Sequence, residues 1–140
     1  MKQKSSPKLD GKKLRIAIIL PRFNDHIGKI LCQNVVNNLA NKPKIFRVPG
    51  ALEIPLAAQK IAGKFDVIIA LGVIVKGETA HFDIVAQTSA KGIMDVSLKT
   101  KTPIINGILT CYTEKQAAKR ANTKGKEFAE SAIEMGLLKL

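Results

Sequence analysis

The feature that most constrains the fold is an apolar run from Val67 to Val75 that breaks into a polar turn at Gly77. Beyond the turn, apolar or small residues recur at helical spacing, at positions 82, 85, 86, 90, 93 and 94. A short run that is apolar throughout is typical of a strand buried on both faces, and the spacing after it is typical of an amphipathic helix. The stretch therefore predicts a strand, a tight turn and a helix, and ligands of open α/β sheets bind at such turns.

The turn carries residues suited to a phosphorylated ligand. Gly77 lets the backbone approach a ligand closely, and Thr79 could cap a helix whose free N–H groups favour an anion. His81 would stand in the first helical turn, where its side chain could exchange a proton near neutral pH. Each residue also has a purely structural interpretation, because caps and acidic residues such as Glu78 commonly serve only the helix terminus.

Strand-like and helix-like segments alternate along the whole chain. Strands are expected at 14–20, 44–48, 66–75 and 103–109, and helices at about 25–40, 53–62, 82–98, 114–121 and 126–138. This order predicts an α/β fold, a single-domain three-layer α/β/α sandwich with a four-stranded parallel sheet. Residues 1–13, rich in Lys and Ser, are expected to form a flexible N-terminal arm, so that the α/β domain spans residues 14–140.

Composition narrows the function classes. The net charge of +12 raises nucleic acid as a partner, but +4 of it lies in residues 1–13 and the remainder is scattered, with only 4% aromatic residues to stack on bases. No apolar run is long enough to span a membrane or to form a convincing signal peptide. Cys32 and Cys111 lie far apart with no metal-ligand spacing, which fits a reducing cytosol. We therefore expect a cytoplasmic protein that binds neither nucleic acid, membrane nor metal.

Four strings of the sequence resemble one known family. Residues 77–83 (GETAHFD) and 48–55 (VPGALEIP) match its two most specific motifs, and residues 22–24 (RFN) match the turn after its first strand. Residues 119–124 (KRANTK) are similar to a further motif whose Arg binds phosphate. On these strings the chain, from about Arg15 to Met135, resembles the 6,7-dimethyl-8-ribityllumazine synthase family of riboflavin biosynthesis.

The resemblance implies a flavodoxin-like fold and a specific reaction. In that family, 5-amino-6-(D-ribitylamino)uracil condenses with 3,4-dihydroxy-2-butanone 4-phosphate to give 6,7-dimethyl-8-ribityllumazine, phosphate and water. Imine formation, phosphate loss, ring closure and dehydration need no cofactor. The implied partners are these two small-molecule substrates and further copies of the chain, as a homopentamer or an assembly of pentamers.

By the same resemblance, several segments hold the pyrimidine. Phe23 would stack on its ring, and stacking of this kind contributes on the order of 1 kcal/mol. The resemblance implies that main-chain or side-chain groups of further residues complete the pyrimidine site: Ala51, Leu52, Glu53, Val73, Ile74 and Val75. Asn106 would be supplied by the next subunit. Among these pyrimidine-site residues, two depart from the family pattern: Leu52 stands where an aromatic residue is usual, and Asn106 where many relatives have Phe. Asn106 would meet the pyrimidine by hydrogen bonding instead of stacking.

The phosphorylated substrate is implied to lie against Glu78 and Thr79. Arg120 of the next subunit would bind its phosphate, a task that suits the planar, bidentate guanidinium. His81 would be the proton donor and the one catalytic residue.

Two other functions remain open on the sequence. A flavin- or nucleotide-binding module with the same sheet and no chemistry would bind flavin mononucleotide and form no product. A small basic nucleic-acid binder would be retained on DNA in a salt-dependent manner.

Overall fold

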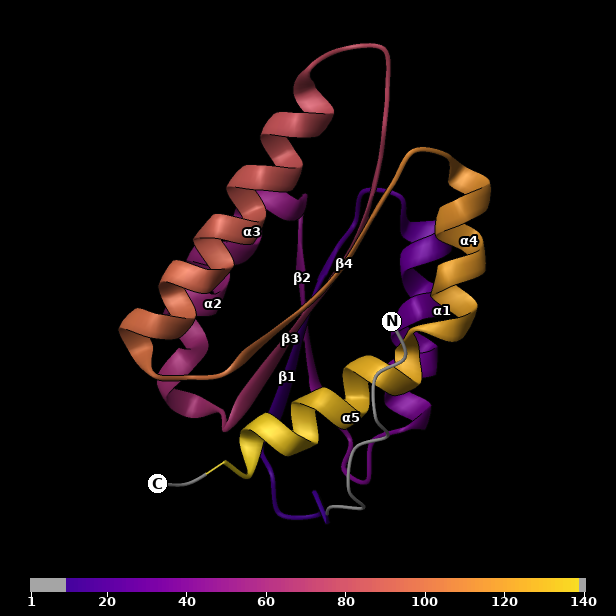
Figure 1. The fold of residues 1–140 in the computed structure, drawn as a ribbon. Coiled ribbons are helices and arrows are strands. Elements are labelled where there is room, and N and C mark those ends of the chain that lie inside the picture. Colours follow the sequence, from indigo (N-terminus) through magenta and orange to yellow (C-terminus); the bar gives the residue numbers. More distant parts are fainter. Residues whose placement is uncertain (1–9, 139–140) are drawn as a thin grey trace.

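The computed structural model describes residues 10–138 of the 140-residue chain. Within them, β1 (Ile16–Pro21), β2 (Lys44–Val48), β3 (Val67–Val75) and β4 (Ile104–Cys111) form one parallel sheet in the order β2-β1-β3-β4. The helices are α1 (Asp25–Asn37), α2 (Ile54–Ile61), α3 (His81–Thr100), α4 (Glu114–Thr123) and α5 (Gly125–Gly136), with short 3-10 turns η1 (Ala51–Glu53) and η2 (Ala62–Lys64). Figure 1 shows the sheet between two helical layers.

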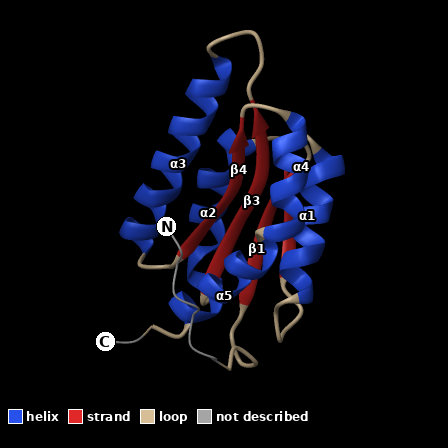
Figure 2. Cartoon of the chain, turned by 45° about the vertical axis from the view of Figure 1, so that its right-hand side comes forward, coloured by secondary structure: helices blue, strands red, loops and turns tan. Residues whose placement is uncertain are grey.

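Each face of the sheet is covered by its own apolar core. On one face, Ile18 and Ile69 meet helices α1, α4 and α5, and on the other, Ile19 and Ile68 meet α2 and α3. Figure 2 shows these helices on the two sides of the strands. Successive strand residues point to opposite faces, so β1 and β3, which are covered on both, are apolar at nearly every position. The predicted α/β/α sandwich with a four-stranded parallel sheet is confirmed, and its strand order is the flavodoxin-like one.

Parallel pairing brings the carboxyl ends of the strands to one edge of the sheet. Pro21 at the end of β1 is in register with Val48 at the end of β2, and Val75 of β3 is in register with Cys111 of β4. The turns that follow β1, β2 and β3 therefore begin close together, although they are far apart in sequence.

Several element ends differ from the prediction. The expected helix at 25–40 ends at Asn37, because Nδ2 of Asn38 donates to the Asn34 carbonyl (2.7 Å) that a further helical turn would use. The expected helix at 53–62 is an α-helix only from Ile54 to Ile61, with a 3-10 turn at each end. The last strand is longer than expected and runs to Cys111.

The predicted N-terminal arm falls mostly outside the described residues, which begin at Asp10. The last part of that stretch is attached to the domain: the carbonyl of Gly11 accepts hydrogen bonds from the N–H of Leu14 (3.0 Å) and from Nδ2 of Asn41 (3.1 Å). Gly11 is buried, and a Cβ at this position would lie 3.1 Å from Ile133. Residues 1–9 of the predicted arm stay a prediction.

Candidate active site

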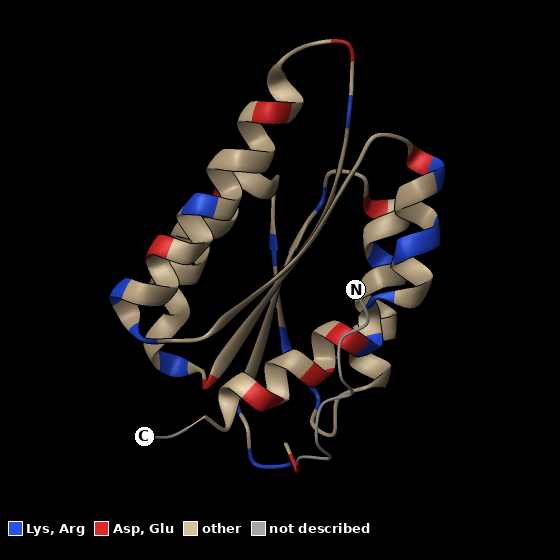
Figure 3. Cartoon of the chain, viewed as in Figure 1, with Lys and Arg blue, Asp and Glu red and all other residues tan. Residues whose placement is uncertain are grey.

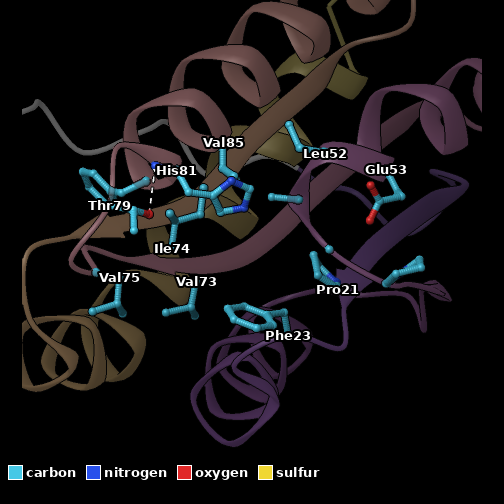
Figure 4. A pocket seen from close by; sticks show the side chains of 15 residues that line it. Pro21, Phe23, Leu52, Glu53, Val73, Ile74, Val75, Thr79, His81 and Val85 are labelled. Atoms are coloured by element: carbon cyan, nitrogen blue, oxygen red, sulfur yellow. Dashed lines mark hydrogen bonds between the residues drawn. The ribbon is translucent and has the colours of Figure 1, made fainter.

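A cleft of about 470 Å³ lies at the carboxyl edge of the sheet, on the side covered by α2 and α3. Three segments form it: the end of β1 with its turn, the stretch from the end of β2 through η1, and the end of β3 with the start of α3. Its lining comprises Pro21, Phe23, Pro49, Gly50, Ala51, Leu52, Glu53, Val73, Ile74, Val75, Gly77, Thr79, His81, Phe82 and Val85. Figure 4 shows the His81 ring between Ile74 and Val85, with Phe23 and Glu53 on the opposite side of the cleft.

The turn after β1 holds Phe23 at the cleft through backbone hydrogen bonds. The N–H of Arg22 donates to Val48 (2.8 Å) and that of Phe23 to Pro49 (3.3 Å). Asn24 has a left-handed backbone (φ 56°), which Asn tolerates better than most residues, and its Nδ2 donates to the Val73 carbonyl (2.9 Å). The Phe23 side chain is 71% exposed. The ring is therefore available to a flat ligand on a turn tied to both β2 and β3.

The segment after β2 brings a carboxylate against a glycine. The N–H of Glu53 donates to the Gly50 carbonyl (3.2 Å), which closes the 3-10 turn η1. A Cβ on Gly50 would lie 3.2 Å from Oε1 of Glu53, so a larger residue there would push the carboxylate aside. Ala51 is buried, whereas Leu52 is 40% exposed and faces the cleft.

The β3–α3 connection supplies the helix N-terminus. His81 is the first residue of α3, and Ala80, not Thr79, is its N-cap. The expectation that Thr79 caps the helix needs this correction: Thr79 lies one residue earlier, where its hydroxyl accepts the N–H of His81 at 3.3 Å. The contact satisfies the first N–H of the helix, and the imidazole is exposed within the cleft. Partial positive charge at a helix N-terminus favours an anion here.

The structure brings most of the predicted site residues together in one chain. Phe23, the segments 51–53 and 73–75, Thr79 and His81 all line the cleft. Glu78 is exposed in the β3–α3 loop and does not line it.

Asn106 and Arg120 lie away from this cleft. Asn106 lies on β4, the edge strand of the sheet, where it pairs with Ala70 near the middle of β3. Its Oδ1 accepts the N–H of Ile108 (3.1 Å). Arg120 is exposed on α4, on the other face of the sheet, where its Nη1 lies 3.5 Å from the Gln116 carbonyl.

Sequence reasoning missed four further lining side chains, those of Pro21, Pro49, Phe82 and Val85. Phe82 and Val85 lie on α3 and pack partly against the core under α2 and α3, so their helical spacing indicated only core packing. Val85 lies four residues after His81 and three after Phe82, and this spacing was the available signal, because side chains three or four residues apart share a helix side.

Among the described residues, the groups with a shifted pKa do not line the cleft. A hydrogen bond from Lys29 and the adjacent Arg47 guanidinium hold the pKa of Asp25, at the start of α1, below its ordinary value, against the opposing effect of burial. Burial raises the pKa of the Cys32 thiol. Within residues 10–138, no group of three or more His, Cys, Asp or Glu side chains is placed to hold a metal ion.

The fold and the cleft define a class: a flavodoxin-like α/β domain with an apolar pocket, a histidine and a helix N-terminus at the carboxyl edge of its sheet. Residues 13–139 match the model of the family described as 6,7-dimethyl-8-ribityllumazine synthase. The chain belongs to this family, which confirms the resemblance seen in its motifs.

Curated relatives that carry the family's name are similar over nearly their whole length. The chain is 46% identical to the protein of Nitrosospira multiformis, with 94% of this chain and 88% of the relative covered. It is 43% identical to the protein of Azoarcus sp. (93% and 88% covered) and 42% identical to that of Pelodictyon phaeoclathratiforme (91% and 90% covered). None of the helices in the described part of the chain is long and apolar enough to cross a membrane.

Proposed function

We propose that this protein condenses 5-amino-6-(D-ribitylamino)uracil with 3,4-dihydroxy-2-butanone 4-phosphate to form 6,7-dimethyl-8-ribityllumazine. The observation that carries the proposal is the cleft itself, which places an exposed aromatic ring opposite a histidine at a helix N-terminus. A flat heterocycle and a phosphorylated chain need these two environments within one pocket. Family membership supports the same reaction, the penultimate step of riboflavin biosynthesis.

The pyrimidine lies on the Phe23 side of the cleft. Its ring stacks on Phe23, while the main chain of residues 73–75 and the Ala51–Glu53 turn hold its edge and its ribityl chain. Apolar Leu52 and Ile74 exclude water around the heterocycle. Much of the rate enhancement then comes from holding two reactive molecules in one orientation.

The phosphorylated substrate lies at the start of α3. Gly77, Thr79 and the helix N-terminus receive its phosphate. Glu78, in the same loop but outside the cleft, contacts the substrate only if the loop moves inward when the substrate binds. The 5-amino group attacks the ketone and loses water to give an imine, phosphate leaves, and the ribitylamino nitrogen closes the ring with loss of a second water. His81 donates and accepts the protons that these steps move.

The site is completed by a neighbouring copy of the chain. Asn106 and Arg120 lie outside the cleft of their own chain, and we assign them to the pyrimidine and the phosphate of an adjacent subunit. Helix α3 supports self-association: Ile84, Met94 and Leu98 are 56%, 59% and 72% exposed, and at 3.6 residues per turn they fall within a sector of roughly 80°. We infer a homo-oligomer, a pentamer or an assembly of pentamers, in which this apolar stripe is covered.

The protein acts in the cytosol. Both of its cysteines, Cys32 and Cys111, are unpaired thiols buried in the domain, the state that a reducing compartment maintains.

Mixing the purified protein with both substrates tests the proposal. Lumazine absorbance should appear only when both are present, with one phosphate released per lumazine. Tight binding of flavin mononucleotide without lumazine formation would instead indicate a flavin-binding module. Salt-dependent retention on DNA would indicate a nucleic-acid binder. Figure 3 argues against that outcome, because the basic residues are spread over both helical layers and several loops.

A further inference from the structure

Arg47 bridges the two ends of the turn that carries Phe23. Its Nε donates to the Leu20 carbonyl (3.0 Å) and its Nη2 lies 3.4 Å from that of Pro21, the last residue of β1. The same Nη2 donates to Oδ1 of Asp25, the first residue of α1, at 2.5 Å. The guanidinium thus holds together the strand that enters the turn and the helix that leaves it.

Arg47 does this from outside the cleft. It does not line the cavity, and it projects from β2 on the opposite face from Phe46 and Val48, which pack in the core under α2 and α3. Any influence on a ligand must therefore pass through the turn.

Phe23 lies within the turn that Arg47 bridges. Its side chain is 71% exposed, so little packing of its own orients the ring, and its direction follows from the backbone of residues 22–24. On the β2 side, that backbone is tied by the N–H of Arg22 to Val48 and by the longer bond from Phe23 to Pro49 (3.3 Å). Arg47 is the side chain that joins both flanks of the same turn.

We propose that Arg47 is a positioning residue for the pyrimidine substrate, acting by fixing the orientation of Phe23. The inference rests on the proposed function, in which Phe23 stacks on that substrate. Arg suits the role because its rigid fork presents several donors in one plane, whereas Lys offers a single charged nitrogen.

The fold should survive removal of the guanidinium. The Arg47 and Asp25 side chains are 34% and 33% exposed, and pairs open to solvent contribute little to stability. Asp25 also keeps its ion pair with Lys29 (3.1 Å), so its carboxylate stays compensated.

Steady-state kinetics of Arg47→Met should show a selective loss. We expect the KM for ribitylaminouracil to rise by about fivefold, the ratio that matches a stacking contact of about 1 kcal/mol. The KM for the butanone phosphate and the kcat at saturation should stay unchanged, and Arg47→Lys should restore only part of the loss. Equal rises in both KM values would overturn the proposal.

Arg15→Met is the matched control. Arg15 also pairs with an aspartate, Asp66 (3.2 Å), but at the amino end of the sheet, away from the cleft. This variant should leave both KM values at the wild-type level. An equal effect of the two substitutions would show that Arg47 serves only general stability.

Phe23→Ala separates this inference from the proposed function. It should raise the KM for the pyrimidine, and adding Arg47→Met to it should cause no further rise, because the ring that Arg47 orients is gone. Independent, additive effects would overturn the role of Arg47 while leaving the stacking role intact. An unchanged KM for the pyrimidine in Phe23→Ala would overturn both the stacking role of Phe23 and the positioning role of Arg47. The proposed reaction itself would be overturned only if the wild-type protein formed no lumazine.

Discussion

Gly125→Ala tests the close contact between α1 and α5. Gly125 is the buried first residue of α5, and a Cβ there would lie 2.5 Å from Cβ of Asn34, 2.8 Å from its carbonyl carbon and 2.9 Å from the nitrogen of Val35. Two of these atoms belong to the α1 backbone and cannot rotate away. Non-bonded carbons ordinarily lie about 3.5–4.0 Å apart, so the two helices must separate by about 1 Å.

The expected loss in the free energy of unfolding follows from this separation of α1 and α5. Overpacking a core costs about 1–3 kcal/mol, and the hydrogen bond from Nδ2 of Asn34 to the Ala121 carbonyl (2.8 Å) would be stretched as well. Replacing Gly also lowers the conformational entropy of the unfolded chain, which stabilises the folded state by about 0.4–1 kcal/mol. We expect a net loss of about 2 kcal/mol in the free energy of unfolding, or about 7 °C in Tm for a domain of this length.

Urea unfolding followed by circular dichroism measures this loss. The matched control is Gly63→Ala, because a Cβ on Gly63 meets nothing within 4 Å. Its free energy of unfolding should equal or slightly exceed that of the wild type, at equal protein concentration. If the two variants differ by less than about 0.5 kcal/mol, within the usual effect of neutral surface changes, the packing argument is wrong.

Three further predictions concern the site and its surroundings. His81→Ala should lower kcat by up to roughly 10²-fold, within the usual range for acid–base residues, and wild-type turnover by a folded variant would remove His81 from the mechanism. Arg120→Ala should raise the KM for the butanone phosphate far more than that for the pyrimidine, with partial rescue by Lys; equal effects would make Arg120 structural. Because the pKa of folded Asp25 lies below its ordinary 3.8, its contribution to stability is present above that pH and is lost as the pH falls through the folded value. Asp25→Asn should therefore reduce the acid-induced loss of unfolding free energy, and an unchanged loss would contradict this.

The sheet could be predicted from the sequence because burial on both faces leaves a strong pattern. Runs such as Val67–Val75 have no competing interpretation once a polar turn and a helical period follow them. Helix ends were less predictable, since they depend on single contacts such as the one between Asn38 and the Asn34 carbonyl.

The residues of the candidate site could be predicted only where they belong to a recognisable sequence motif. Residues 77–83 and 48–55 carry specific motifs, and the structure brings residues of both to one cleft. Phe82 and Val85 were missed because core and cleft residues share the same helical spacing. Arg47 gave no local signal: its partners, Leu20, Pro21 and Asp25, lie 22 to 27 positions away and meet it only through the β1–β2 pairing.

Subunit mixing tests most directly whether the active site is shared between copies of the chain. His81→Ala and Arg120→Ala proteins are dissociated, mixed in equal amounts and reassembled. The assay uses butanone phosphate well below the raised KM of Arg120→Ala, where each parent alone is nearly inactive. In a ring of head-to-tail contacts, about a quarter of the interfaces then join an intact His81 to an intact Arg120. We predict lumazine formation at about a quarter of the wild-type rate per site. Activity no higher than the mean of the two parents, in a mixture shown to have exchanged subunits, would contradict a site completed by a neighbour.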